Sequence, residues 1–221
     1  MAAHTAPGPA PLARGLRLRR RALIPLIAAL VIAGVLVAVL VPGSAAKPAA
    51  PGYAGLTVVP PKQAPPLALK SYLGTTVNLG GYRGKAVLVT FIYTHCPDTC
   101  PLIVSKLHTA QAQMTAAERS RFAIIAVSVD PRGDGPATVA NFLRVHEMTG
   151  RMQYLIGSPA TLLRTWSAWG IASRKVPNSP DQVEHTALIY GITGHGQIAV
   201  VYPANFSVGE IIHDAGRLAR A

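Results

Sequence analysis

The chain has 221 residues and two cysteines, and its 21 lysine and arginine residues against 9 acids give a formal net charge of +12. Five of the positive charges lie within the first 21 residues, whereas from Pro66 onward 14 basic residues face 9 acidic ones, a net charge of +5. That second part contains no run of basic residues with interleaved aromatic side chains, so we expect no nucleic-acid binding.

The first 42 residues predict a membrane anchor. Residues 1–21 form a basic tail without an acid, and residues 22–42 form an uncharged apolar segment long enough for a helix that crosses about 30 Å of hydrocarbon. Arginines on one flank place that flank in the cytoplasm. We therefore expect a single-pass protein of the cell membrane with a cytoplasmic N-terminus and an extracytoplasmic C-terminal domain. A secretory signal cut near Ser44 is the alternative, and it would export the same domain.

The segment that follows divides into a spacer and one domain. Residues 43–65 are rich in proline, alanine and glycine, a composition that favours an extended, semi-rigid linker. The remaining residues, 66–221, have the length of one ordinary domain with its own core.

Strand-like and helix-like patterns alternate along this domain. The apolar runs 86–93 and 122–129 are typical of buried strands, because they are rich in β-branched and aromatic residues. Further strands are expected at 75–79, 186–192 and 198–202, and helices at 101–114, 136–147, 159–169 and from 208 onward. The order predicts an α/β fold, a sandwich built around a central mixed sheet.

Cys96 and Cys100 lie where the 86–93 strand passes into the next helix. Four residues apart on helical backbone, two thiols lie on the same side and share one target. The positive end of the helix favours thiolate, which is the form that binds metal or attacks a disulfide. Two sulfur donors alone suit Cu(I), and an added imidazole suits zinc or Cu(II) as well. A dithiol exposed outside the cytoplasm tends to oxidise, so a redox partner is the competing target.

Several motifs around these cysteines resemble those of the Sco/SenC family of copper chaperones. They occur in the order found in the family, and the resemblance runs from about Pro66 to Arg220 and includes a single N-terminal anchor. The motifs are Arg83-Gly84-Lys85, Val89 to Pro101 with Cys96 and Cys100, Ser128-Val129-Asp130-Pro131, and Glu184-His185-Thr186-Ala187.

The resemblance implies a thioredoxin-like fold and copper, Cu(I) or Cu(II), as the bound metal. It implies delivery of that copper to the dinuclear copper centre of cytochrome c oxidase, whose copper-site subunit would be the partner. It also implies three metal ligands, Cys96, Cys100 and His185. In thioredoxin-like folds a proline before a threonine-containing strand packs against the cysteine loop, and His185 occupies the matching position here.

Two acids are expected to support this site. Asp98 stands in the first turn of the helix after Cys96, where a carboxylate stabilises the helix start and is placed to contact a partner. Asp130 ends the second buried strand; it is expected to support the cysteine loop by hydrogen bonding, or simply to begin the turn before Pro131. His95 is a weaker candidate ligand, since a residue beside Cys96 at a strand end points elsewhere.

Two functions remain open on the sequence. A copper metallochaperone would use the three ligands, whereas a thiol–disulfide oxidoreductase would use Cys96 and Cys100 as a redox-active pair to reduce the cysteines of the oxidase copper site. A Cys-x-x-x-Cys spacing with a distant histidine favours metal, because thioredoxin-type enzymes usually carry Cys-x-x-Cys. A structural disulfide would close a loop of about three residues and contribute little. The oligomeric state is not predicted.

Overall fold

The computed structural model describes residues 52–177 and 179–221. The expected basic tail, the expected anchor over 22–42 and the first part of the expected spacer lie outside the described residues. Within the described ranges, no helix is long and apolar enough to cross a membrane.

The described residues form an eight-stranded mixed sheet, with the strand order β1-β10-β9-β4-β5-β6-β2-β3, and a separate two-stranded pair, β7-β8. The strands are β1 (Leu56–Gln63), β2 (Ala68–Ser71), β3 (Thr76–Asn78), β4 (Ala86–Ile92), β5 (Phe122–Ser128), β6 (Gln153–Ile156), β7 (Ser173–Val176), β8 (Ser179–His185), β9 (Leu188–Ile192) and β10 (Gln197–Pro203).

The centre of the sheet is β4, whose seven residues are all buried. It pairs in parallel with β5 and antiparallel with β9, and β5 pairs in parallel with β6. A strand covered on both faces reads as a continuous apolar run, which is why the sequence pattern located β4 and β5. The predicted central mixed sheet is therefore confirmed.

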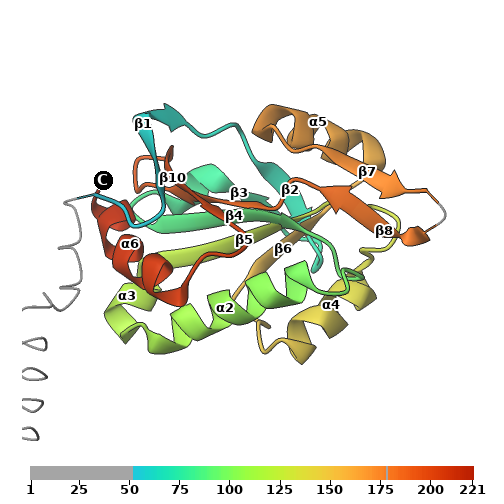
Figure 1. The fold of residues 1–221 in the computed structure, drawn as a ribbon, viewed down its shortest axis with the longest axis horizontal. Helices are drawn as coiled ribbons and strands as arrows, with labels where there is room; N and C mark the ends of the chain where they lie inside the picture. Colours follow the sequence, from blue (N-terminus) through green and yellow to red (C-terminus); the bar gives the residue numbers. More distant parts are fainter. Residues whose placement is uncertain (1–51, 178) are drawn as a thin grey trace, which may run out of the picture. The chain divides into compact units, whose positions relative to one another are not determined.

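Helices cover both faces of this sheet. In Figure 1, α2, α4 and α6 lie on one side and α5 lies on the other. The helices are η1 (Leu79–Tyr82, a 3₁₀ turn), α2 (Thr99–Gln113), α3 (Ala116–Ser120), α4 (Pro136–Val145), α5 (Pro159–Trp169) and α6 (Val208–Arg220). The side chains of Ser158 and Ser207 cap α5 and α6, as their sequence patterns predict.

The N-terminal boundary of the domain differs from the prediction. Residues 56–63, predicted as part of an extended, semi-rigid linker ending at 65, form β1 and pair antiparallel with β10. The register shifts between Thr57 and Lys62, where Pro60 and Pro61 lie. Proline lacks the N–H that a central strand needs but is tolerated at an edge. β1 is such an edge, so its prolines led the composition argument to the wrong boundary.

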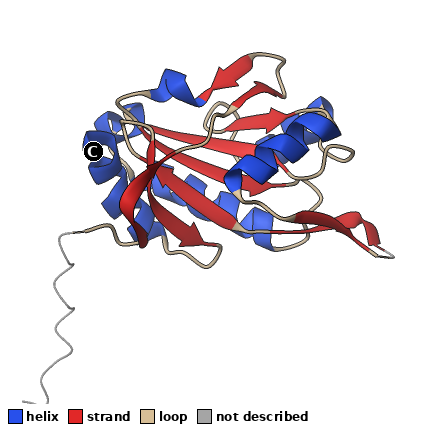
Figure 2. Ribbon diagram, turned by 90° about the horizontal axis from the view of Figure 1, so that it is seen from above, coloured by secondary structure: helices blue, strands red, loops and turns tan. Residues whose placement is uncertain are grey.

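The β7–β8 pair was not predicted from the sequence. Figure 2 shows it extending from one end of the domain, beyond the main sheet. Its register sets Ser173 opposite His185 and Lys175 opposite Val183. This pair therefore carries the predicted histidine ligand, and its placement decides where that imidazole lies.

Candidate metal centre

Three chain segments meet at one edge of the main sheet. The cysteine loop, residues 93–98, follows the carboxyl end of β4, and the β5–α4 loop, residues 129–135, follows the carboxyl end of β5. Parallel neighbours end at the same edge of a sheet, so these loops lie side by side. Because β9 runs antiparallel to β4, with Ile189 opposite Thr90, the chain just before β9 comes to that edge as well. His185 belongs to this third segment.

The cysteine loop passes directly into α2. Asp98 is the N-cap of this helix, and its carboxylate accepts a hydrogen bond from the N–H of Thr99. Asp98 thus lies at the helix start, one position before the first turn in which it was expected. The Sγ of Cys96 accepts a hydrogen bond from the N–H of Cys100 at 3.2 Å. Backbone N–H groups at the first turn lack partners within the helix, and here one of them points at a sulfur.

The two thiols ionise very differently. Hydrogen bonds from the Cys100 thiol and from backbone N–H groups lower the pKa of Cys96 to about 6, although burial acts in the opposite direction. The same thiol–thiol hydrogen bond, followed by burial, raises the pKa of Cys100 far above its usual range. At neutral pH the pair therefore holds one thiolate, on Cys96, and one proton, on Cys100.

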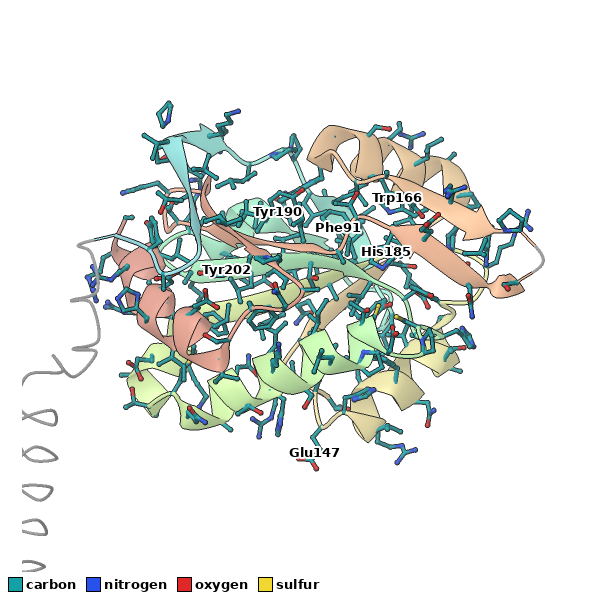
Figure 3. The ribbon with its side chains drawn as sticks, in the orientation of Figure 1. Phe91, Glu147, Trp166, His185, Tyr190 and Tyr202 are labelled. Atoms are coloured by element: carbon teal, nitrogen blue, oxygen red, sulfur yellow. The ribbon has the colours of Figure 1, made fainter. Side chains whose placement is uncertain are left out.

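His185 faces the cysteines as an uncharged ring. Its Nε2 lies 3.9 Å from the Sγ of Cys100, and its Nδ1 lies 3.1 Å from the carbonyl oxygen of Thr186. A carbonyl only accepts, so Nδ1 carries the proton and Nε2 presents its lone pair towards the sulfur. Burial lowers the pKa of His185, which keeps the ring neutral at physiological pH. Figure 3 shows His185 where the β7–β8 pair meets the rest of the domain.

Tyr93 joins the cysteine loop to the histidine strand. Its ring meets the imidazole of His185 edge to face, with centroids 5.8 Å apart. Its hydroxyl oxygen accepts a hydrogen bond from the N–H of Val183 at 3.3 Å. Tyr93 also takes part in lowering the pKa of Cys96. The sequence patterns did not single out this residue, although it ends the apolar run that precedes the cysteines.

A cavity of about 330 Å³ opens between these elements. Cys96 and His185 both line it, while Cys100 lies fully buried behind them. Its lining residues are Tyr93, Cys96, Pro97, Asp98, Thr99, Val176, Gln182, Val183, Glu184, His185 and Ala187. A partner or a small ligand that enters this cavity reaches the thiolate and the imidazole from the same side.

The donor set fits a soft or borderline metal ion. Metal ions lie about 2.3 Å from sulfur and about 2.0 Å from imidazole nitrogen in zinc sites, so two such donors on one ion are about 3.5–4 Å apart. The separation of 3.9 Å between Cys100 Sγ and His185 Nε2 agrees with that span. Across residues 52–177 and 179–221, however, no three His, Cys, Asp or Glu side chains form an assembled metal-binding group. The three predicted ligands are neighbours that would have to close around an ion.

Asp130 takes the alternative role, since its Oδ1 accepts a hydrogen bond from the N–H of Arg132 at 3.3 Å in the turn at Pro131. It is 2% exposed and its carboxylate pairs with Lys175 of β7 at 3.1 Å, on the side of the histidine. The cysteine loop is held instead by Asp134, whose Oδ1 accepts from the N–H and the hydroxyl of Thr94 at 2.9 and 2.7 Å. Sequence reasoning missed Asp134; its only signal was that it is a second acid, four positions after Asp130 in the segment that follows the same strand.

His95 lies apart from the cavity. It is exposed, and its Nδ1 lies 3.3 Å from the hydroxyl of Thr94 rather than near either sulfur. This agrees with the expectation that a residue beside Cys96 points elsewhere.

Fold and site together define a thioredoxin-like α/β domain in which a Cys-x-x-x-Cys loop at a helix start faces a histidine. A family model described as SCO1/SenC matches residues 60–220, more than half of the chain. The chain belongs to the SCO1/SenC family.

Solved structures of the family have the same fold. Apo Sco1 from Thermus thermophilus superposes with a TM-score of 0.66 at 26% identity, covering 74% of this chain and 95% of that one. The copper-bound structure of Bradyrhizobium japonicum ScoI gives a TM-score of 0.60 at 28% identity, covering 71% and 99%. These likenesses confirm the predicted thioredoxin-like architecture.

A curated human relative extends the comparison. The mitochondrial protein SCO1 homolog is 25% identical over 150 residues, which are 66% of this chain and 49% of the human protein. The chain thus spans about half the length of that relative.

Proposed function

We propose that this protein is a membrane-anchored copper metallochaperone that delivers copper to the dinuclear copper centre of cytochrome c oxidase. The observation that carries the proposal is the approach of His185 Nε2 to within 3.9 Å of Cys100 Sγ, in a site where Cys96 lines the same cavity. The relative from Bradyrhizobium japonicum, whose structure contains copper, supports copper as the cargo. Two sulfurs and one neutral imidazole are donors suited to copper in either oxidation state.

Each proposed ligand has a defined protonation state before copper binds. Cys96 is already a thiolate at neutral pH, so it offers a negative sulfur at once. Cys100 retains its proton until a cation arrives, and binding at its sulfur releases that proton to solvent. His185 contributes a lone pair without losing a proton. Capture of copper by the reduced domain is therefore expected to release about one proton near pH 7.

One observation favours thiol–disulfide reduction as the second candidate function. The low pKa of Cys96 beside a protonated Cys100 is the asymmetry that a reductase needs. The Cys96 thiolate would attack a partner disulfide, releasing one partner thiolate and forming a mixed disulfide. Cys100, after losing its proton, would attack Cys96 and release the second partner thiol. One disulfide forms here as one is reduced in the partner.

A single mixing experiment separates the two functions. The copper-loaded protein is incubated with the metal-free copper-site subunit of cytochrome c oxidase, and both copper and free thiols are counted on each protein after separation. We expect copper to move to the subunit while Cys96 and Cys100 remain reduced. Oxidation of both cysteines with a matching gain of two thiols on an oxidised subunit, and no copper transfer, would establish the reductase instead.

A further inference from the structure

The β5–α4 loop contacts both halves of the candidate metal centre. It is braced internally, since the N–H of Asp134 donates to the carbonyl of Asp130 at 2.9 Å and the hydroxyl of Ser128 donates to Asp134 Oδ2 at 2.6 Å. The N–H of Asp130 in turn donates to the hydroxyl of Ser128 at 3.1 Å. Both carboxylates are almost completely buried, so their positions are determined by these contacts.

Asp134 holds the cysteine side of the centre. Its carboxylate accepts four hydrogen bonds: from the N–H and hydroxyl of Thr94, from Ser128, and from the hydroxyl of Tyr154 at 2.8 Å. Thr94 stands two residues before Cys96. A buried carboxylate with four donors is fully satisfied, and charge-assisted hydrogen bonds of this kind are strong. The start of the cysteine loop is therefore tied to the end of β5.

Asp130 holds the histidine side. Its Oδ1 forms an ion pair with the Nζ of Lys175 at 3.1 Å. Lys175 lies on β7, opposite Val183 of β8. Ser173, which is also on β7 and pairs with His185 of β8, donates its hydroxyl to the carbonyl of Val129 at 3.3 Å. Two contacts thus join β7 to the β5–α4 loop. Because β8 pairs with β7, these contacts also determine the position of His185.

Close packing at Gly133 joins the two sides. A Cβ at this position would lie 2.4 Å from Asp130 Oδ2 and 2.9 Å from Nδ1 of His95. The backbone of the β5–α4 loop therefore touches a residue of the cysteine loop and the carboxylate that holds β7. A side chain at this position would displace the Asp130 carboxylate or the His95 ring.

We propose that Asp130 and Asp134, here called the acidic clamp, set the separation between the cysteine pair and His185. Both are positioning residues, since the contacts described above join them to Lys175 and Thr94 and not to the three ligands. The inference rests on the proposed function, in that the separation matters because three donors must meet on one copper ion. Groups that orient metal ligands are typically worth about 10–100-fold in metal affinity.

Substitution of Lys175 tests the Asp130 arm. Lys175→Gln removes the cation and Lys175→Arg keeps it. Arg174→Gln is the matched control, because it removes the neighbouring cation of β7, whose ion pair with Glu184 of β8 is exposed. In the metal-free reduced protein, amide hydrogen exchange is followed in β8 and in the cysteine loop. In Lys175→Gln we expect the amide hydrogens of β8 to exchange at least about tenfold faster than in the wild type. The exchange rates of the cysteine loop should be unchanged. Lys175→Arg and Arg174→Gln should match the wild type.

The Asp134 arm is tested by Asp134→Asn, with Thr94→Val as a milder variant that removes one hydrogen bond. The readout is amide hydrogen exchange in the metal-free reduced protein. We expect both variants to exchange faster in the cysteine loop, while β8 exchanges as in the wild type. Should Asp134→Asn fail to fold, Thr94→Val still decides the question.

Copper titrations of the same variants connect the clamp to function. We expect Lys175→Gln to bind Cu(II) about 10–100-fold more weakly and to show a changed Cu(II) spectrum, because the imidazole of His185 is displaced. If hydrogen exchange in β8 is unchanged in Lys175→Gln, or rises equally in Arg174→Gln, the proposed role of the acidic clamp is wrong. Copper binding by the wild type would still support the proposed function in that case. If the wild type binds no copper, the proposed function fails, and hydrogen exchange still decides the clamp.

Discussion

At the scale of single residues, the chemistry rests on two cysteines with opposite ionisation. Cys96 receives hydrogen bonds from Cys100, whereas Cys100 is buried and donates its proton, so one helix turn separates a thiolate from a thiol. The neutral ring of His185 adds a nitrogen donor without adding charge. A soft cation is attracted to this set by one full negative charge, and a disulfide is attacked by the same sulfur.

The ionisation of Cys96 predicts a pH profile for its alkylation. Thiolate is the reactive form, so in the reduced, metal-free protein the rate should rise with pH around a midpoint near 6. Cys100 should stay unmodified until far more alkaline pH, because its pKa is raised. Mass spectrometry of peptides after timed alkylation between pH 4 and pH 10 measures both. Equal rates at the two sulfurs would contradict the assignment.

Removal of the imidazole should separate metal binding from thiol chemistry. We expect His185→Ala to weaken Cu(II) binding by more than the roughly 10–100-fold typical of losing a group that only orients a ligand. The alkylation profile of Cys96 should change little, because the Cys100 thiol and nearby backbone N–H groups, and not His185, lower the pKa of Cys96. Competition titrations and the Cu(II) absorption spectrum provide the measurements. His95→Ala is the control: a loss of affinity equal to that of His185→Ala would mean that the ligand was misassigned.

At the scale of elements, the site depends on α2, the β7–β8 pair and the β5–α4 loop, which meet at one edge of the main sheet. Helix α2 supplies the N–H groups, β7 and β8 supply the histidine, and the β5–α4 loop lies between them. The sequence located α2 well, since its cap and its apolar residues are local. It did not reveal β7 and β8, whose largely polar segments lack the alternation that marks a half-buried strand.

The edge strand β1 yields a stability prediction. The N–H groups of Ala54 and Gly55 donate to the fully buried carboxylate of Asp214, which also accepts from the hydroxyl of Tyr202. A chain that begins at residue 66 loses β1 and these donors. Loss of a hydrogen bond to a carboxylate costs about 1.5–3 kcal/mol, and the lost pairing of β1 adds to this cost.

Urea unfolding of the metal-free reduced protein measures this difference. A chain that begins at residue 52 is the control and should unfold at the same urea concentration as a longer one. If the chains that begin at 52 and 66 unfold at the same concentration, β1 is not part of the folded domain and the predicted spacer was right.

At the scale of the whole molecule, topology decides which compartment the site serves. We propose that residues 22–42 anchor the protein in the cell membrane, with the basic tail in the cytoplasm and the domain outside, on the strength of the apolar length and the flanking arginines. Copper delivery to a membrane-bound oxidase would then need no release from the bilayer.

The chain's two cysteines make this topology testable. In intact cells under reducing conditions, a membrane-impermeant thiol reagent should label the full-length protein, and the label should map to Cys96. The protein should remain with the membrane after carbonate extraction, and mass spectrometry should find the residues of the basic tail. Labelling only after lysis would overturn the proposed orientation, and a mature N-terminus near residue 45 would favour a cleaved signal.

The amino-acid sequence was sufficient for the features that depend on neighbours along the chain. The cysteine spacing, the capped helices and the buried runs of β4 and β5 are local patterns, and the family motifs directed attention to His185. The partners of Asp130 and Asp134, by contrast, do not follow from any local pattern. Asp130 and Asp134 are four residues apart in one loop, yet one binds Lys175 and the other binds Thr94. Only the tertiary structure decided this, because the destination of a buried side chain depends on which distant strands pack around it.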